Sequence, residues 1–539
     1  MVRDYLIIGA GPAGLQLAAL LERDGRDYLV LERGSAPGTS FTRYPRHRQL
    51  ISTNKVNTGF TDPELNLRMD WNSLLSDDPE LLFTRYSERY FPPADELVRY
   101  LADFAARTGV RVEYGTEAVR IAREDGVFTV LDGNGRTLRA RRLVMATGIS
   151  KLYEPPIPGI GLAERYDTFD TDPVSFTNQR VLVIGKGNSA FETADSLVEK
   201  AAVIHVVGPR SVKLAWKTHY LGHLRAVNNN FLDTYQLKSQ NAVLDGTVES
   251  IEKAAGGGFR VMLRYARTTE PLRELHYDRI IVCTGFRFDA SVFDESCRPA
   301  LAINDRFPAQ TSSFESVNVP DLYFAGTLMQ QRDFKKSTNG FIHGFRYATR
   351  ALHRILGARH LDTPWPARTL AATPEAIADA VIGRVNRSSG LWQQFAFLGD
   401  VVGVDGDRAV YQEEVPLDHV TDGGLGPCPH RFVVDLEYGA EHDRTDPFDV
   451  DVPRVVENDV DHAMDSTYLH PVVRHYRDGV LAGTHHLAEN LENEWNLPAI
   501  HRQPLTAFVK ECLDRAVPRR RTGHPRRGGR PAGVRARRP

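Results

Sequence analysis

The chain has 539 residues, of which 42% are hydrophobic and 25% are charged, and its formal net charge is −2. At about 150 residues per domain, this length predicts roughly three to four domains with buried cores. The charge balance does not indicate a nucleic-acid-binding protein, and no apolar run approaches the ~20 residues that span a bilayer. The cysteines lack the two-residue spacing of a dithiol redox motif, which argues against a disulfide framework and against a dithiol reductase: Cys283, Cys297, Cys428 and Cys512.

An apolar run at residues 4–8, a glycine-rich turn and a helical apolar pattern follow one another at the N-terminus. In such a unit the first glycine permits the tight turn, the second lets the backbone approach a pyrophosphate, and the third lets helix and strand pack closely. The helix N-terminus then faces the phosphate charge. A second strand at residues 28–31 ends in an acid that suits a ribose hydroxyl. The predicted dinucleotide site comprises Gly9, Gly11, Pro12, Ala13, Gly14, Glu32 and Arg33.

The same strand, turn and helix pattern returns at residues 180–197, where Ala190 occupies the third small position. The next strand, at residues 203–207, has no carboxylate at its end and is followed by Arg210. A guanidinium there suits a 2′-phosphate and favours NADPH over NADH, the alternative being a solvated loop cation. The second predicted site comprises Gly185, Gly187, Asn188, Ser189, Ala190 and Arg210.

A strand that ends in Thr-Gly follows each nucleotide unit, at residues 143–148 and 281–285. Their matching positions predict crossings between two domains. Two nucleotide sites in one chain indicate one cofactor that stays bound and one that exchanges, as in enzymes that move hydride from nicotinamide to flavin. We therefore predict FAD at the first site and NADPH at the second, with Thr147, Gly148 and Gly285 among the contacts.

Over residues 4–356 the chain resembles the flavin-containing monooxygenase-like flavoproteins, and within them the branch of the endoplasmic reticulum lumen. The resemblance implies an α/β fold with an NADPH domain inserted in an FAD domain. It also implies that Gly326, Thr327 and the helix from Gly340 lie beside the flavin, where His343 assists and Asn72 helps to hold the oxygen adduct. Six strings carry the resemblance: residues 41–48, 50–52, 70–76, 187–194, 233–239 and 340–347.

Each finer assignment has an alternative. His343 fits a packing residue on a helix face, and Asn72 fits a turn former between Asp70 and Ser73. Arg43 is assigned to phosphate or acidic-substrate binding, yet a basic loop is often only solvated. The family's His before the second glycine motif is absent from residues 166–170, which leaves oxygenation open.

Prolines after residue 361 mark a linker to a predicted α+β accessory region. Its acidic stretch and its histidines match no common metal site, so no metal is predicted. The predicted domains are residues 1–165 and 291–360 for FAD, 166–290 for NADPH, 361–517 for the accessory region, and 518–539 for a disordered Arg-rich tail.

The leading hypothesis is that NADPH reduces FAD and that the reduced flavin uses molecular oxygen to oxygenate a small nucleophilic substrate containing nitrogen or sulfur. One alternative is an NAD(P)H-dependent reductase without oxygenation, and another is a flavin-containing protein whose C-terminal region binds a partner. The chain opens directly on a strand and shows no entry signal or retention tail, so we expect a cytoplasmic, bacterial-type relative. The oligomeric state stays open, with a homodimer as one alternative.

Overall fold

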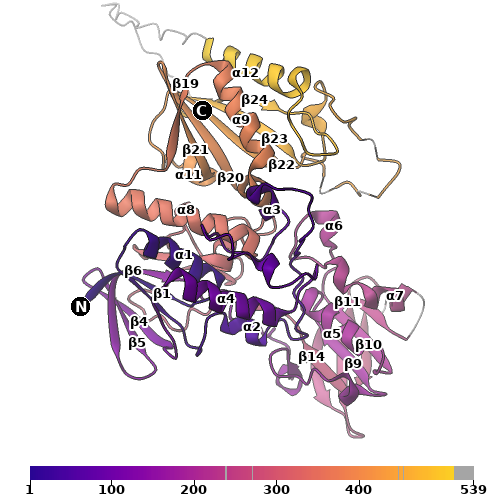
Figure 1. The fold of residues 1–539 in the computed structure, drawn as a ribbon. Helices are drawn as coiled ribbons and strands as arrows, with labels where there is room; N and C mark the ends of the chain where they lie inside the picture. Colours follow the sequence, from indigo (N-terminus) through magenta and orange to yellow (C-terminus); the bar gives the residue numbers. More distant parts are fainter. Residues whose placement is uncertain (237–239, 270, 443, 447, 453, 515–539) are drawn as a thin grey trace, which may run out of the picture.

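The computed structural model describes residues 1–514, except residues 237–239, 270, 443, 447 and 453. Three domains follow, each built around one large β-sheet (Figure 1). The predicted disordered tail, residues 518–539, lies outside the described residues. Within the described ranges, no helix is long and apolar enough to cross a membrane.

The sheet of the first domain is completed by a strand from much later in the chain. Four parallel strands run in the order β3, β2, β1 and β6, and β18 also pairs in parallel with β6. Two antiparallel strands, β5 and β4, extend the sheet. The strands are β1 (Val2–Ile8), β2 (Tyr28–Leu31), β3 (Val112–Glu113), β4 (Ala118–Glu124), β5 (Val127–Asp132), β6 (Thr137–Met145) and β18 (Leu322–Phe324).

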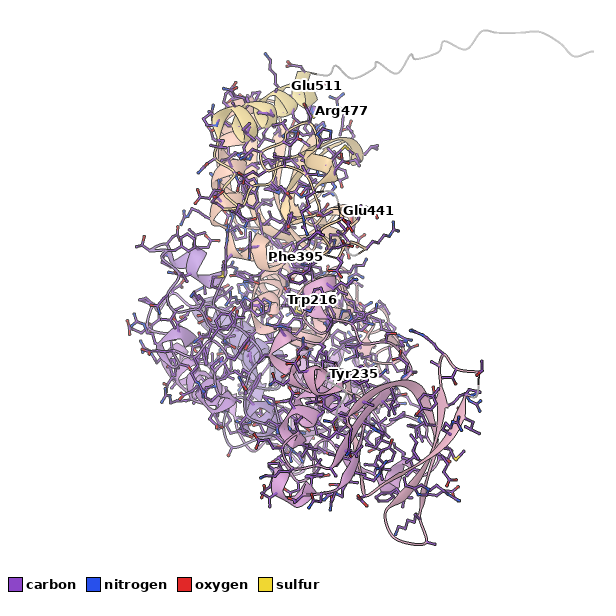
Figure 2. All side chains as sticks on the ribbon, turned by 90° about the vertical axis from the view of Figure 1, so that its right-hand side faces the viewer. Trp216, Tyr235, Phe395, Glu441, Arg477 and Glu511 are labelled. Atoms are coloured by element: carbon purple, nitrogen blue, oxygen red, sulfur yellow. The ribbon has the colours of Figure 1, made fainter. Side chains whose placement is uncertain are left out.

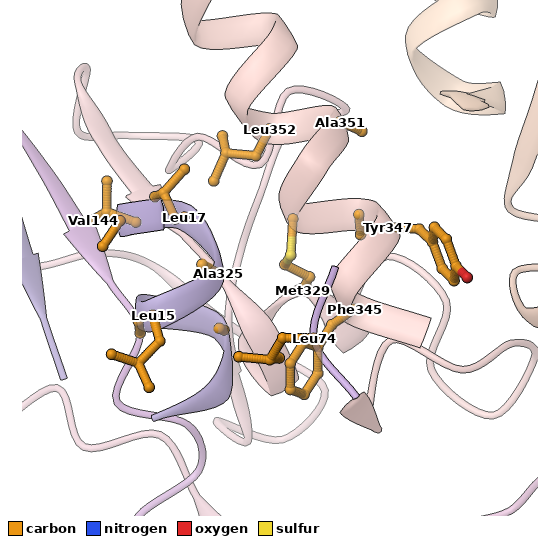
Figure 3. Close-up of a cluster of buried hydrophobic side chains, with 14 of the residues drawn as sticks. Leu15, Leu17, Leu74, Val144, Ala325, Met329, Phe345, Tyr347, Ala351 and Leu352 are labelled. Atoms are coloured by element: carbon orange, nitrogen blue, oxygen red, sulfur yellow. The ribbon is translucent and has the colours of Figure 1, made fainter. Parts of the chain in front are cut away.

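Two helices, α1 (Pro12–Arg23) and α8 (Ile342–Leu361), pack against each other and against this sheet. Leu15 and Leu17 of α1, Val144 of β6 and Leu352 of α8 are fully buried in one core cluster (Figure 3). Each such side chain contributes about 1.5–3 kcal/mol by leaving water. The same cluster includes Leu101 of α4 (Ala94–Thr108), so this core fixes where the N-termini of α1 and α8 lie.

The second domain is inserted between β6 and β18. Its parallel strands run in the order β8, β14, β9, β10 and β11, with β12 and β13 added in antiparallel. The two connections to the first domain pair as β7 (Lys151–Leu152) and β15 (Phe286–Arg287), each just after a Thr-Gly pair. The other elements are β8 (Glu164–Arg165), β9 (Arg180–Ile184), α5 (Asn188–Leu197), β10 (Val203–Gly208), α6 (Ala215–Thr218), α7 (Asn230–Gln236), β11 (Ala242–Lys253), β12 (Phe259–Tyr265), β13 (Leu272–Tyr277) and β14 (Arg279–Val282).

The C-terminal domain is a six-stranded antiparallel sheet in the order β19, β21, β20, β22, β23 and β24. Val402 and Val434 lie in a core with α9 and α12, whereas Val401 and Val433 belong to the core of the first domain. The sheet therefore buries both faces, one under its own helices and one toward α8 (Figure 1). Its elements are β19 (Ala367–Ala371), α9 (Pro374–Arg387), α10 (Ser389–Gln393), β20 (Leu398–Asp405), β21 (Arg408–Pro416), α11 (Leu417–Thr421), β22 (His430–Glu437), β23 (His470–Arg477), β24 (Val480–His486) and α12 (Gln503–Asp514).

The predicted fold class is confirmed: one dinucleotide-binding domain is inserted in another, and an α+β domain follows. The boundaries given above, at residues 165, 290, 360 and 517, stay predictions.

A buried group of charges joins the C-terminal domain to the first domain. Arg384 of α9 donates to Asp400 (Nε to Oδ2, 3.1 Å), to Glu414 (Nη2 to Oε1, 3.2 Å) and to Glu64 of the first domain (Nη1 to Oε1, 2.7 Å). Arg350 of α8 also binds Glu414, with 2.6 Å between Nη2 and Oε1. Burial by itself raises the pKa of Glu414, but the surrounding arginines lower it to about 2. The carboxylate therefore stays ionised at the interface.

Replacing Arg384 by Met is expected to destabilise the protein by about 3–5 kcal/mol, because it leaves the buried carboxylate of Asp400 without its counter-ion, while Glu414 keeps Arg350. Arg502→Met is the matched control, since Arg502 pairs with Asp379 on the exposed surface of the same domain. There the expected loss is below about 1 kcal/mol. Urea unfolding midpoints measure both variants. Equal, small losses in the two would contradict the importance given to this interface.

Candidate functional site

The first glycine turn is shaped by close backbone contacts. Gly9 has a φ of +105°, and a Cβ on it would lie 2.9 Å from the carbonyl oxygen of Ala146. A Cβ on Gly14 would lie 2.0 Å from the carbonyl oxygen of Gly9, so α1 can pack here only through a glycine. At Gly11, by contrast, a Cβ would meet open space. The turn therefore leaves room for a ligand at the N-terminus of α1, where backbone N–H groups and the helix dipole favour phosphate.

Glu32 at the end of β2 holds this turn in place. Its carboxylate accepts hydrogen bonds from the backbone N–H of Ala10 and of Gly34, both at 2.8 Å, and from Thr39 Oγ1 at 3.0 Å. A carboxylate has about four acceptor positions, so one is left for the predicted ribose contact. Glu32 and Arg33 line a small cavity of about 180 Å³ next to the turn.

The second turn repeats this geometry. Gly185 has a φ of +130°, and a Cβ on it would lie 2.2 Å from the carbonyl oxygen of Cys283, while Gly187 faces open space. Asn188, the first residue of α5, donates from Nδ2 to the His223 carbonyl at 2.8 Å and accepts from the Arg225 N–H at 2.9 Å. The side chain of Asn188 thus ties the loop at residues 223–225 to the turn.

A cavity of about 1030 Å³ extends from this turn and contains the predicted Arg210. Four further cations line it: Lys186, Lys213, Arg306 and Lys335. Burial is the largest cause of a lowered pKa of Lys335, and the charges of Lys213, Arg210 and Arg306 add to it. This clustering of positive charge suits a ligand with several phosphates. The sequence pattern did not single out Arg306 and Lys335, because they come from segments far from the second turn.

A central cavity of about 460 Å³ lies between the two turns. Its lining brings together eleven of the predicted residues, from both domains and from the segment that returns to the first domain. The eleven are Gly11, Pro12, Ala13, Arg33, Thr147, Gly148, Asn188, Ser189, Gly326, Thr327 and His343. The predicted Gly185, Gly187 and Gly285 line the cavity that contains Arg210, and Ala190 is buried in the core of the second domain.

His343 lies at the start of α8, and its side chain is almost fully buried. Its ring stacks on Trp71, with centroids 4.2 Å apart and an interplanar angle of 28°, and on Phe341 at 5.8 Å. Burial holds the pKa of His343 well below its usual range, so the ring is neutral. Neither ring nitrogen has a hydrogen-bond partner among the described residues, although His343 lines the cavity. A ligand in the cavity is positioned to supply one.

Two predicted residues lie elsewhere. Asn72 is buried with its amide engaged, since Nδ2 donates to the Thr53 carbonyl at 3.2 Å and Oδ1 accepts from Ser52, and it does not line the cavity. The turn interpretation fits it better, because Asp70 accepts from its backbone N–H at 3.0 Å. Arg43 is half exposed and outside the lining, with Nη2 3.3 Å from the Asp167 carbonyl oxygen.

The residues of the central cavity that sequence reasoning did not assign include Trp71, Glu192 and Arg225. Glu192, on α5, is largely buried, and burial raises its pKa to about 7. Its position five residues after Gly187, on the helix that starts at the turn, was the available signal. The guanidinium of Arg225 lies 5.4 Å from the Trp71 ring centroid and donates to the Ile51 carbonyl at 2.9 Å.

The residues that form this site lie in a chain that is similar to known proteins over most of its length. Residues 6–326 match the model of the family described as pyridine nucleotide-disulphide oxidoreductase. FAD-dependent oxidoreductase domain-containing protein 2 of Mus musculus is 38% identical, over 95% of this chain and 84% of that protein. Its counterpart in Danio rerio is 37% identical, over 95% and 83%. Both are animal proteins, so they do not support the expected bacterial-type relative.

Among solved structures, the bacillithiol disulfide reductase of Staphylococcus aureus has a TM-score of 0.52 at 19% identity, covering 67% of this chain and 100% of that one. The flavin-containing monooxygenase of Stenotrophomonas maltophilia also has a TM-score of 0.52 at 19% identity, covering 66% and 99%. At this identity the likeness concerns the fold of the first two domains. The chain belongs to the pyridine nucleotide-disulphide oxidoreductase family, within the flavin-dependent oxidoreductase superfamily.

Proposed function

We propose that the protein is an FAD-dependent NADPH oxidoreductase that oxygenates a small substrate containing nitrogen or sulfur. The observation that carries this proposal is that the three cavities share walls. Gly11, Arg33 and Thr147 line both the cavity at Glu32 and the central cavity. Asn188, Ser189 and Phe286 line both the central cavity and the basic one. Two extended dinucleotides could therefore meet end to end in the central cavity.

The residues present fit these two ligands. The open cradle at Gly11 and the free acceptor position on Glu32 suit the pyrophosphate and ribose of FAD, and the name of the mouse relative supports this choice. The open cradle at Gly187 and the cluster around Arg210 suit NADPH with its 2′-phosphate. When bound, FAD would supply the redox chemistry, taking two electrons from NADPH and passing them to an acceptor.

The protein's own contribution lies in the walls of the central cavity. Trp71, Phe41 and Phe341 give it apolar sides that keep water from the reacting atoms. The N-terminus of α8, at Ile342, directs its partial positive charge at the cavity and favours negative charge there. The neutral His343 can donate or accept one hydrogen bond without adding charge. Together these features support oxygenation of a small, uncharged nucleophile.

A reductase that does not oxygenate is the second candidate, and one observation favours it. The amide of Asn72, which the monooxygenase resemblance places over the flavin, is engaged by Ser52 and Thr53 outside the cavity lining. The dispersed cysteines argue against a protein dithiol as the acceptor in either case. The described cysteines form no disulfide, and burial raises the pKa of Cys283 to about 12, which makes that thiol unreactive.

The two functions differ in what happens to oxygen. The purified protein is reduced with NADPH in the absence of oxygen and then mixed rapidly with aerated buffer containing a small amine or thioether. We expect oxygenated product in proportion to the NADPH consumed. Hydrogen peroxide as the sole product would favour the reductase. A protein that is not reduced by NADPH would leave only the role of a flavin-containing partner-binding protein.

Valine substitutions at Gly11 and Gly187 are expected to show which of the two sites binds which cofactor. Gly11 and Gly187 have negative φ values and open space at the Cβ position, so a side chain at either fits the fold but fills the phosphate site. Gly11→Val should be purified without flavin absorbance. Gly187→Val should keep its flavin, be reduced by dithionite, and lose at least about 100-fold in affinity for NADPH. Flavin retained by Gly11→Val would refute the assignment of the first site.

The carboxyl of Glu192 is expected to make flavin reduction depend on pH. Because burial raises its pKa to about 7, it is neutral below pH 7 and ionised above it. Oxidation of NADPH leaves a positive charge on the nicotinamide, which a carboxylate in the cavity stabilises. The rate of reduction by NADPH should therefore rise through pH 7, by about tenfold for an interaction worth one pKa unit.

Glu192→Gln should remove this pH dependence while the flavin stays bound. Asp195→Asn is the comparison variant. Burial also raises the pKa of Asp195, to about 6, but its carboxylate accepts from the Phe231 N–H away from the cavity lining. The charge of Asp195 contributes to the raised pKa of Glu192, so this variant should move the rise to lower pH without removing it. Stopped-flow reduction between pH 5.5 and 8.5 measures all three proteins. A rise through pH 7 that survives in Glu192→Gln would assign the titration to another group.

A further inference from the structure

The C-terminal domain contacts the second domain at residues 214–228, the segment that contains α6. Lys217 Nζ lies 3.4 Å from Asp446 Oδ2, and the rings of Trp216 and Phe448 are 5.0 Å apart in an edge-to-face arrangement. In Figure 2, Trp216 lies below Phe395 and Glu441, at the junction between the C-terminal domain and the rest of the molecule. Residues 214–228 are thus held by a domain to which they do not belong.

Three rings form the centre of this contact. His219 packs on Tyr438 and His442, with centroid distances of 4.3 and 4.9 Å, and Tyr438 and His442 stack on each other at 4.6 Å. Tyr438 directly follows β22 and also meets Phe395 edge to face at 5.2 Å. His219 follows α6 and has a φ of 53°, in the left-handed region that is common where a helix ends. Its ring is thereby placed against the C-terminal domain.

The same segment forms walls of both large cavities. Tyr220, His223 and Leu224 line the basic cavity, and Arg225 and Asn228 line the central one. The residue next to His219 contacts the first domain, because Tyr220 OH accepts from Gln330 Nε2 at 2.7 Å. His219 therefore lies one to nine residues before the residues that line the cavities, and a displacement of His219 would be passed to these walls along the segment.

We propose that the C-terminal domain positions residues 214–228 for NADPH binding, and that Tyr438 is the positioning residue through which it acts. This inference rests on the proposed function, since it requires NADPH at the second site. The family match ends at residue 326, before this domain, and the names of the animal relatives, which match 95% of the chain, state no role for it. The contacts described above give the C-terminal domain a role in NADPH binding.

The test compares Tyr438→Ala with Tyr438→Phe in the full-length, flavin-loaded protein. Two quantities are measured: the Kd for NADP⁺, by titration of the oxidised protein, and hydrogen–deuterium exchange of the peptide covering residues 214–228. Tyr438→Ala should weaken NADP⁺ binding about tenfold, which equals about 1.4 kcal/mol, and should speed exchange in that peptide. Tyr438→Phe keeps the ring and should behave like the unaltered protein. Flavin content should not change in either.

Tyr468→Ala is the matched control, because Tyr468 belongs to the same domain but is half exposed, and its side chain contacts Arg454 of that domain. It should leave both quantities unchanged. Phe448→Ala tests the same contact with little risk of a folding defect, because this ring is 74% exposed and yet touches Trp216. It should speed exchange of the peptide at residues 214–228 and reduce the affinity for NADP⁺ by less than Tyr438→Ala does.

The inference is overturned if Tyr438→Ala and Phe448→Ala bind NADP⁺ normally with unchanged exchange at residues 214–228. It is also overturned if Tyr438→Phe loses as much affinity as Tyr438→Ala, because the ring contact would then not be responsible. Failure of the proposed function gives a different result: the unaltered protein itself would lack flavin or would not bind NADP⁺.

Discussion

The site depends on a backbone contact that occurs twice. In each dinucleotide domain the first glycine of the turn packs against the carbonyl group at the end of a neighbouring strand, Gly9 against Ala146 and Gly185 against Cys283. The hydrogen bonds around the two contacts also match, with Ala146 N donating to Ile8 O at 2.8 Å and Cys283 N to Ile184 O at 2.7 Å. No side chain fits between these segments. The contact therefore fixes the N-terminus of each following helix relative to its sheet.

The connections between the domains begin just after these contacts. Gly148 and Gly285, both with positive φ, turn the chain into β7 and β15, which pair with each other. The second domain is thereby attached through two adjacent strands, and its turn is brought to the same central cavity as the first. Helix α8 adds a further connection, because its N-terminus lines the cavity and Arg350, two turns later, binds Glu414 of the C-terminal domain.

The sequence was sufficient for features that depend on neighbouring residues. The strand, turn and helix units at Gly9 and Gly185 and the α+β character of the C-terminal domain follow from local patterns that the folded chain keeps. The insertion of one domain in the other follows from the family resemblance. Residues whose role depends on packing between domains were harder. Glu192 reaches the cavity because α5 lies against the first domain, and its position on the helix that starts at the second turn was the local signal for that place.

Two assigned residues lie outside the lining of the central cavity for the same kind of reason, and their roles stay predictions. The family resemblance assigned Asn72, but Asp70 turns the backbone so that Trp71 faces the cavity and Asn72 faces the core. Arg43 ends a short helix, Thr39–Arg43, and its guanidinium lies against Asp167. In both cases the residue type was plausible, and a bend of a few residues decided which neighbour reached the ligand space.

The buried group of charges between the first and C-terminal domains has a consequence for shortened forms of this flavoprotein. Arg68 of the first domain donates to the carbonyl oxygens of Val385 and Ser388 at 2.9 and 3.2 Å, and its guanidinium lies 4.8 Å from the Trp392 ring centroid. A chain that ends after α8 would lack the Val385 and Ser388 carbonyls that bind Arg68 and the Glu414 carboxylate that binds Arg350. It would also expose the apolar surface around these arginines. The first two domains thus depend on the C-terminal domain to pair these buried charges and to cover the surface around them.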